Sequence, residues 1–454
     1  MAATFDCVVK GGIVATPGGL EELDIGITKG RVAALGQLRA GSAAETLDCR
    51  GLHVLPGVID TQVHFREPGL EHKEDLSTGT AAAALGGVTA VFEMPNTKPP
   101  TTGEAEFAEK CRRAQGRAWV DIAFYIGATQ DNAGDLARLE RLAGCAGVKV
   151  FMGSSTGNLL VADDADIQRV LANGTRRVAV HAEDETRLRQ RYTIVAGGAD
   201  PGRHADWRDT ETAVSATRRV TRLAEATRRR VHVLHVTTAE EIGLLAEHRD
   251  LVSVEVTPQH LTLQAPDCYD ELGTFAQMNP PIRDARHRAA LWRAVADGIV
   301  DCIGSDHAPH TREEKKKPYP DSPSGMPGVQ TLLPIMLDHV AAGRLSLQRL
   351  IDLTSAGPAR LFGLAGRGRI AVGYSADLSV VDLSQRRMIT HRWIASRCGW
   401  TPFDGMTVTG WPLATVVRGR IVMRDGALQG EPCGELLRFF ETDGAADLTG
   451  IGRS

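Results

Sequence analysis

The chain has 454 residues, of which 43% are hydrophobic and 24% charged, and its formal net charge is -4. This length and composition suffice for a large hydrophobic core and a second, smaller one. Because acidic and basic residues nearly balance, no long-range electrostatic field favours nucleic acid or an anionic membrane surface. The composition therefore predicts an ordinary soluble globular protein without a polyanion partner.

The N-terminal sequence MAATFDCVVKGG lacks the basic segment and apolar stretch of a secretory signal peptide. Nowhere do about 18 uncharged apolar residues run together, as a membrane span requires. The eight cysteines, at positions 7, 49, 111, 145, 268, 302, 398 and 433, show no C-x-x-C spacing. This pattern argues against a thiolate zinc site and a disulfide framework. We therefore expect a cytoplasmic protein with reduced, mostly buried thiols.

Both ends of the chain carry short β-rich runs separated by glycine turns. DCVVKGGIVAT and LDIGITKGRVAALG lie near the N-terminus, and GRIAVGYSADLSVVDLS and ATVVRGRIVMRDGAL lie near the C-terminus. Such runs are typical of strands in a small sheet. We predict one small β-sandwich-like domain, formed by residues 1–55 and 365–454, with a second domain inserted between its halves.

Residues 56–364 alternate apolar, β-branched runs with amphipathic helical stretches, as parallel βα units do. Eight strands in this span predict an α/β fold, a (β/α)₈ barrel of the TIM type. An open doubly wound sheet is the alternative, but no G-x-G-x-x-G follows the first strand. The predicted strands cover residues 53–60, 88–95, 119–128, 147–152, 177–183, 231–238, 252–259 and 300–307.

Polar side chains follow the predicted strands at their carboxyl ends, where barrels of this kind place their active sites. Imidazole and carboxylate are good zinc ligands. Two metal ions held there can share one hydroxide and activate it for attack on a carbonyl. The sequence therefore predicts a two-metal site made by His64, Lys149, His181, His235 and Asp306.

Each of these residues also has a purely structural interpretation. A lone histidine on a strand is more often a core residue than a ligand. We assign His232 to that class, because it lies three positions before His235 and so faces the other side of the strand. Lys149 has the alternative of a barrel lysine paired with Asp306. The coincidence of all these groups at strand ends favours the site.

Lys149 is the most informative member of the set. Its neighbours Val148 and Val150 mark it as a strand residue in apolar surroundings, where desolvation favours the neutral amine. A neutral amine can react with carbon dioxide to give a carbamate, a carboxylate that is able to bridge two metals.

Sequence motifs over nearly the whole barrel resemble the amidohydrolase superfamily and, within it, the dihydroorotase family. They are, in order, PGVIDTQVHFREPG, GGVTAVFEMPNTKPP, GVKVFMG, HAED, HVLHVT, EVTPQHL, MNPPIR and IGSDHAPH. By this resemblance His64 is a metal ligand, Lys149 the carboxylated bridging lysine, and His181 and His235 ligands of the second metal. Asp306 would bind metal and act as the general base.

The resemblance also implies residues that hold the substrate, chiefly its carboxylate, and a loop that covers the bound ring. An arginine fork pairs bidentately with a carboxylate, which agrees with a binding role for Arg66. The alternative for Arg66 is a surface ion pair with Glu67 or Asp75. The implied substrate-binding residues are Arg66, Asn96, Asn279 and His310, and the implied loop contains Pro323, Gly325 and Gly328.

The chain departs from the family pattern at three positions. Gln62 stands at the first position of a His-x-His motif, and Gln259 at the first histidine of a TPHHL-like run. Gln330 stands at a position where the family often has glutamate. A glutamine amide oxygen is a poor zinc ligand. We therefore expect one firmly bound zinc, at Lys149, His181 and His235, and a weakened second metal position.

The resemblance implies reversible hydrolysis of dihydroorotate to N-carbamoyl-L-aspartate, a step of pyrimidine biosynthesis. One alternative is a related enzyme opening another cyclic ureide, such as a hydantoin, a dihydropyrimidine or allantoin. Another is a catalytically impaired subunit, which would explain Gln62 most simply. The expected partners are a small-molecule substrate and further copies of the chain, with a pyrimidine-pathway protein as an open alternative.

Overall fold

A computed structural model describes residues 5–39, 43–155 and 159–442. One of its two sheets has eight parallel strands in chain order. A parallel bridge between Val63 and His307, and a 2.7 Å bond from the His64 N–H to the His307 carbonyl, connect its two edges. The predicted barrel is therefore confirmed. Its strands are β6 (Val58–Val63), β7 (Val88–Glu93), β8 (Asp121–Gly127), β9 (Cys145–Phe151), β10 (Val178–His181), β11 (Val231–Val233), β12 (Val252–Val256) and β13 (Cys302–Ile303).

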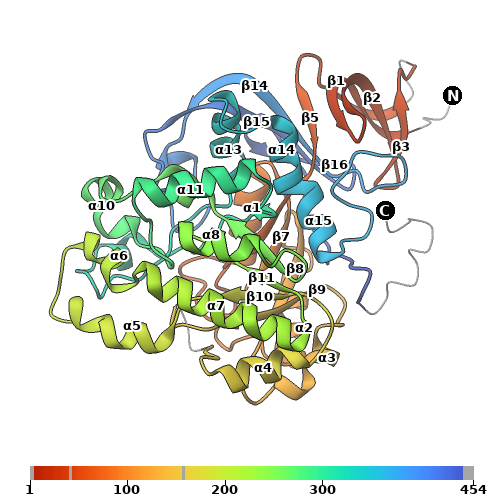
Figure 1. The fold of residues 1–454 in the computed structure, drawn as a ribbon. Helices are drawn as coiled ribbons and strands as arrows, with labels where there is room; N and C mark the ends of the chain where they lie inside the picture. Colours follow the sequence, from red (N-terminus) through yellow and green to blue (C-terminus); the bar gives the residue numbers. More distant parts are fainter. Residues whose placement is uncertain (1–4, 40–42, 156–158, 443–454) are drawn as a thin grey trace.

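Helices alternate with these strands and cover the outside of the barrel, as the long helices α7, α8 and α11 show in Figure 1. Across the described ranges, none of the helices has the length and hydropathy of a membrane-crossing segment. The helices are α1 (Leu76–Leu85), α2 (Glu104–Ala114), α3 (Leu136–Leu139), α4 (Asp164–Ala172), α5 (Glu185–Arg191), α6 (His204–Trp207), α7 (Thr210–Thr227), α8 (Ala239–Ala246), α9 (Pro258–Thr262), α10 (Asp267–Leu272), α11 (Ala285–Ala296), α12 (Arg312–Lys315), α13 (Leu332–Ala341), α14 (Leu347–Ile351) and α15 (Gly357–Phe362).

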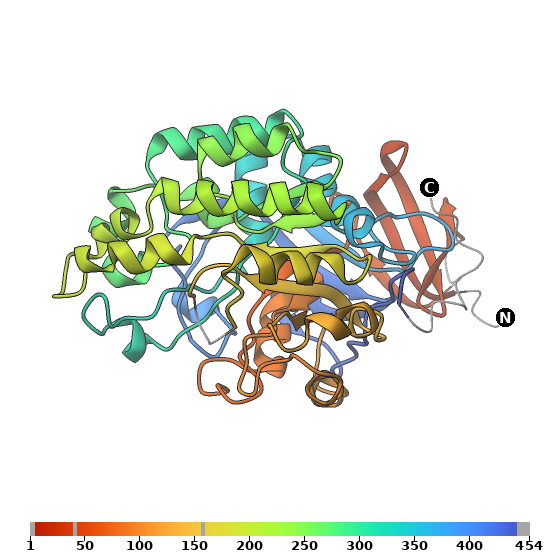
Figure 2. The same cartoon turned by 60° about the horizontal axis from the view of Figure 1, so that its bottom comes forward.

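The second sheet combines strands from both chain ends, as predicted, and lies to one side of the barrel (Figures 1 and 2). Its nine strands run in the order β17-β16-β15-β14-β5-β1-β2-β3, with β4 paired to β1. The domain boundaries at 55/56 and 364/365 stay predictions. The strands are β1 (Phe5–Thr16), β2 (Gly19–Thr28), β3 (Arg31–Gly36), β4 (Ala43–Asp48), β5 (His53–Pro56), β14 (Leu378–Met388), β15 (Thr407–Val417), β16 (Arg420–Arg424) and β17 (Ala427–Leu428).

The predicted strand at 53–60 is two strands in the structure. β5 pairs antiparallel with β14 in the small sheet, whereas β6 begins at Val58 in the barrel. Gly57 lies between them, and a Cβ there would stand 2.2 Å from the Thr89 hydroxyl oxygen. The single-strand prediction was wrong because both halves are apolar and nothing in their composition separates the two sheets.

One part of the barrel interior is filled by apolar side chains. Phe92 packs edge-on against Tyr125, Phe362 and Phe439, with ring centroids 5.1 to 6.2 Å apart. All four rings are buried. Such packing is typical of a TIM barrel, whose interior is a core rather than a channel.

Lys110 of α2 and Glu93 of β7 form a fully buried ion pair. We expect Lys110→Met to lower the free energy of unfolding by about 3–5 kcal/mol at neutral or higher pH, because it leaves the Glu93 carboxylate buried without its cation. Burial raises the pKa of Glu93 to about 7, against the opposing effect of Lys110. Because Lys110 lowers this pKa and the variant lacks it, the orphaned carboxyl should take up a proton at a still higher pH, so the deficit should be smaller at acidic than at alkaline pH.

Urea denaturation at about pH 8 and about pH 5 measures both effects. Arg112→Met on the same helix removes an exposed cation and should change stability by no more than about 0.5 kcal/mol. Equal losses of unfolding free energy in the two variants would show that the buried ion pair adds no stability.

Candidate active site

A cavity of about 20 Å³ lies at the carboxyl ends of the barrel strands. A larger pocket of about 540 Å³ shares Ser155, Asn279 and Ser324 with it and leads towards solvent. His310 lines this outer pocket and not the small cavity. The other predicted site residues are brought together around the small cavity: Gln62, His64, Arg66, Asn96, Lys149, His181, His235, Asn279 and Asp306.

Three of these residues have left-handed backbone conformations. The φ angles are 63° at Arg66, 38° at His235 and 45° at Asp306. A side chain with a Cβ adopts this region at a cost of ~1–3 kcal/mol, and such residues concentrate at functional sites. Here the left-handed turn directs each side chain towards the cavity as its strand ends.

His181 and His235 face each other across the cavity, with His181 Nδ1 and His235 Nε2 3.1 Å apart. Glu183 Oε2 lies 2.9 Å from the other ring nitrogen of His181. Burial raises the pKa of Glu183, but Arg208 and His181 lower it more, so that the carboxylate stays ionised and favours a proton on the neighbouring Nε2, although the two atoms do not meet at a hydrogen-bonding angle. The lone pair of His181 Nδ1 is then free for a metal, in the carboxylate–histidine arrangement typical of such sites.

His64 is oriented in the same way from the opposite side. Asn96 Oδ1 accepts a 2.7 Å hydrogen bond from His64 Nδ1, which leaves Nε2 facing Asp306 Oδ1 at 3.2 Å. Gln62 Nε2 donates to the same carboxylate oxygen at 2.9 Å. The glutamine therefore presents a hydrogen-bond donor to Asp306, where an imidazole lone pair would face a metal.

Lys149 is fully buried beside these groups, its Nζ 4.5 Å from the centre of the Phe151 ring. Burial lowers the pKa of Lys149 to about 7, although Asp306 and Glu255 act in the opposite direction. A large neutral fraction near neutral pH is what reaction with carbon dioxide requires. The donor set of three imidazoles, a carboxylate and a reactive amine fits zinc.

Arg66 is buried and still positively charged, because burial lowers its pKa only to about 10. Its Nε donates to the Pro309 carbonyl at 3.2 Å, and its Nη2 lies 3.4 Å from His310 Nε2. Nη1 has no hydrogen-bond partner among the residues that the structure describes. Because Arg66 lines the cavity, this buried donor is available to an anionic ligand.

Lys73 determines which ring nitrogen of His310 carries a proton. Its Nζ lies 3.0 Å from His310 Nδ1, and Nε2 is 3.1 Å from the Ser324 carbonyl. Since an ammonium only donates, Nδ1 accepts and Nε2 carries the proton. The loop implied to cover the substrate contributes Gly325 to the cavity. A Cβ on Gly325 would lie 2.5 Å from the Ala308 carbonyl oxygen, so only glycine allows this approach.

Sequence reasoning missed several residues at the site, among them Glu183, Lys73, Phe151 and Ser155. The spacing of HAED, with an acid two positions after His181, was a usable signal for Glu183. Of the other unusual glutamines, Gln259 donates to the Ser305 carbonyl at 2.8 Å. Gln330 bridges the Trp393 carbonyl and the Ala395 N–H.

The prediction that His232 faces away from the side of His235 was wrong. His232 packs in the barrel interior, its ring centroid 5.4 Å from that of Phe362. Strand alternation does not reach His235, because the left-handed φ of that residue shifts the register of side chains. Both imidazoles therefore lie inside the barrel, at different depths.

Fold and cavity together define a (β/α)₈-barrel enzyme with imidazole, carboxylate and lysine groups gathered at the strand ends. The sequence model of the amidohydrolase family matches residues 53–422. The chain belongs to the amidohydrolase family.

Among known proteins, the chain is similar to a dihydroorotase from Methanosarcina mazei, with 35% identity over 91% of this chain and 93% of the relative. An allantoinase from Deinococcus radiodurans is 34% identical over 96% of this chain and 99% of that protein. The solved L-hydantoinase (dihydropyrimidinase) from Arthrobacter aurescens superposes with a TM-score of 0.90. That match covers 96% of this chain and 100% of the solved one at 31% identity. All three relatives are named as enzymes that open cyclic amides, and this chain is a hydrolase of that class.

Proposed function

We propose that this protein is a zinc-dependent dihydroorotase. The observation that carries the proposal is the unpaired Nη1 of the buried Arg66, which lines the same cavity as the metal-ligand set. A neutral ring would leave this cation buried without an anion, at a substantial free-energy cost. Dihydroorotate carries a carboxylate on its ring and would pair with it.

His181, His235 and the carboxylated Lys149 would hold zinc, which when bound supplies Lewis acidity for the ring carbonyl and a water of lowered pKa. Glu183 keeps His181 in the ligating tautomer. His64 and Asp306 would contribute to a second metal position, which Gln62 weakens.

Asp306 is the general base in this proposal. Burial raises its pKa to about 7, with Lys149 and His181 opposing the rise. A base with such a pKa can accept the proton of the attacking water near neutral pH and return it to the departing ring nitrogen. Gln62 holds the carboxylate in place through the 2.9 Å bond to Oδ1.

The same chemistry would open hydantoin, dihydropyrimidines or allantoin, which makes a related cyclic-ureide hydrolase the second candidate. The allantoinase and hydantoinase relatives support that candidate. Arg66 separates the two, because only a substrate with a carboxylate uses its charge. The proposal places the enzyme in the cytoplasm, while the homo-oligomer and the pathway partner stay predictions.

Arg66→Ala tests the carboxylate assignment. We expect the variant to raise the Michaelis constant for dihydroorotate roughly ten- to a hundredfold, since a charge-assisted hydrogen bond contributes ~1.5–3 kcal/mol. The Michaelis constant for dihydrouracil, which lacks the carboxylate, should change little. Arg189→Ala in the outer pocket is the matched control and should leave both values near those of the wild type. Equal losses of Arg66→Ala on both substrates would make Arg66 a structural residue.

A further inference from the structure

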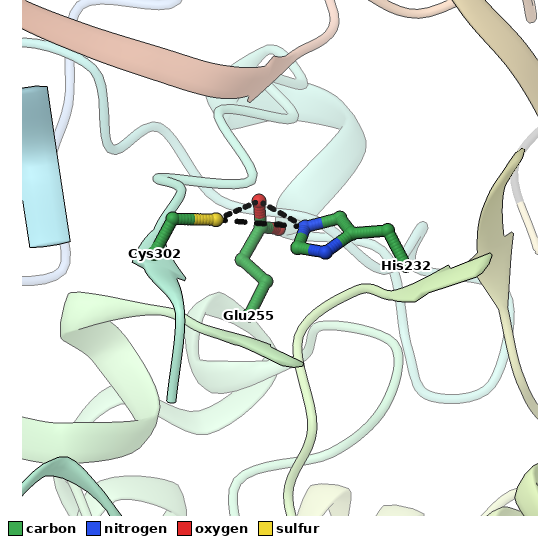
Figure 3. A group of neighbouring side chains, drawn as sticks. All are labelled: His232, Glu255 and Cys302. Carbon is green, nitrogen blue, oxygen red and sulfur yellow. Dashed lines mark hydrogen bonds and ion pairs between the residues drawn. The ribbon is translucent and has the colours of Figure 1, made fainter. Parts of the chain in front are cut away.

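Three side chains meet deeper in the barrel, in positions that the proposed mechanism does not use. They are His232 on β11, Glu255 on β12 and Cys302 on β13, and Figure 3 shows all three pointing towards one another. Each is completely buried. His232 precedes the active-site His235 by three residues and Cys302 precedes Asp306 by four, so the cluster lies below the cavity.

The distances between the three donor atoms match those of a metal site. His232 Nε2 lies 3.3 Å from Glu255 Oε2, and Cys302 Sγ lies 3.5 Å from the imidazole nitrogen and 3.6 Å from the carboxylate oxygen. At zinc–ligand distances of about 2.3 Å for sulfur and about 2.0–2.2 Å for nitrogen and oxygen, tetrahedral donors lie about 3.3–3.6 Å apart. Without a cation, the same three groups are joined by long hydrogen bonds.

The second nitrogen of His232 fixes its tautomer. Nδ1 lies 2.7 Å from the Ser253 hydroxyl, which donates its own hydrogen to the Val231 carbonyl at 3.2 Å. Arg177 also donates to that hydroxyl. Ser253 therefore accepts from His232, and Nδ1 carries a proton. Nε2 then directs a lone pair, or a second proton, at Glu255.

The carboxylate of Glu255 has an oxygen that could coordinate a cation. The Thr61 hydroxyl donates to Oε2, whereas Oε1 has no partner in the part of the chain that the structure describes. Gly304 lets the carboxylate lie directly against its backbone, because a Cβ there would stand 2.7 Å from Glu255 Oε2. A bidentate Glu255 would complete four donor atoms.

We propose that His232, Glu255 and Cys302 bind a divalent cation of the zinc class, separate from the active site and independent of the proposed function. Imidazole, carboxylate and thiolate together suit zinc and cobalt. A thiolate buried as completely as Cys302 needs a cation beside it. Binding displaces the thiol proton and any proton on His232 Nε2, leaving a neutral cluster of one dication and two anions.

The cation would hold three neighbouring strands at one point. β13 is two residues long and pairs with β12 only through Glu255–Cys302 and Val256–Ile303. Glu255 and Cys302, two of the three proposed ligands, therefore form the first of these two residue pairs. Such a bond would keep β13, and with it Asp306, in register with the rest of the barrel.

Metal analysis of the native protein tests the proposal. Because His232, Glu255 and Cys302 line neither the cavity nor the outer pocket, whereas the active-site ligands line the cavity, one equivalent of zinc should remain after dialysis against a chelator that strips the active site, and unfolding should release it. Cys302→Ser should lose this equivalent, whereas Lys149→Ala should keep it. Cys145→Ser, a buried cysteine on the barrel strand β9, is the matched control and should also keep it.

Protein produced with cobalt gives a second readout that needs no variant. Thiolate-to-cobalt charge-transfer absorption and one sulfur at about 2.3 Å in X-ray absorption are expected, even if Cys302→Ser fails to fold. Chelated wild-type protein that retains no metal and shows no sulfur ligand would overturn the proposal. So would a thiolate band that survives in Cys302→Ser. Neither result bears on dihydroorotate turnover, which tests the proposed function separately.

Discussion

Lys149→Ala is expected to reduce dihydroorotate turnover by roughly a thousandfold or more. Metal-assisted hydrolysis draws several kcal/mol of transition-state stabilisation from the ion, and a loss of ~4 kcal/mol corresponds to this factor. In the cavity around Lys149 no other described amine can form a carbamate and take its place. Steady-state kinetics of zinc-loaded protein, with bicarbonate supplied, measures the effect.

Lys110→Met is the control for removing a buried lysine. Its side chain lies in a structural ion pair, so turnover should persist at temperatures where that variant is folded. Mass spectrometry under native conditions should detect the carboxyl group on Lys149 in the wild type and in Lys110→Met, but not in Lys149→Ala. Activity retained in Lys149→Ala, or a bare amine at Lys149 in a metal-loaded crystal, would disprove the carbamate.

Gln62→His should bind one additional equivalent of chelator-labile zinc and gain hydrolytic rate. The wild-type amide donates from Nε2 to Asp306 and has a buried Oε1 without a partner among the described residues, but a neutral amide oxygen is not a good zinc ligand. An imidazole at residue 62 would supply one, completing a ligand set for a second ion. Zinc titration of both proteins, with turnover measured at each stoichiometry, follows the change.

Gln62→Glu extends this experiment, because a carboxylate of the same length is a better zinc ligand than an amide. It should bind more labile zinc than the wild type. If the wild type already holds two labile ions as tightly as Gln62→His, then the glutamine or another residue completes the site and the ligand argument is wrong.

The barrel and most of its cavity could be predicted because β-branched runs end in polar residues, and parallel strands bring their carboxyl ends together. The direction of the side chains was harder to predict from the sequence. That His235 faces the barrel interior like His232 depends on the left-handed φ of His235, which no alternation pattern reveals. Likewise the division of residues 53–60 between two sheets depends on Gly57, which could equally have been a turn within one domain.

The hydrogen-bond partners of the site residues could not be predicted from the sequence either. Asn96 accepts from His64, and Lys73 reaches His310 across 237 residues. The buried cluster at His232 leaves no motif, since its members stand 23 and 47 residues apart on three strands. Such contacts depend on how the barrel strands are placed in space, and the spacing of residues along the chain does not predict them.

The most direct test is the rate of ring opening of dihydroorotate, compared with dihydrouracil, hydantoin and allantoin, as labile zinc is added to the chelated wild-type protein. Turnover should appear with the first labile equivalent. The kcat/KM for dihydroorotate should exceed that of each uncharged ring roughly tenfold or more, as the Arg66 charge predicts. Preference for an uncharged ring, or no turnover of any ring at full zinc loading, would contradict the assignment.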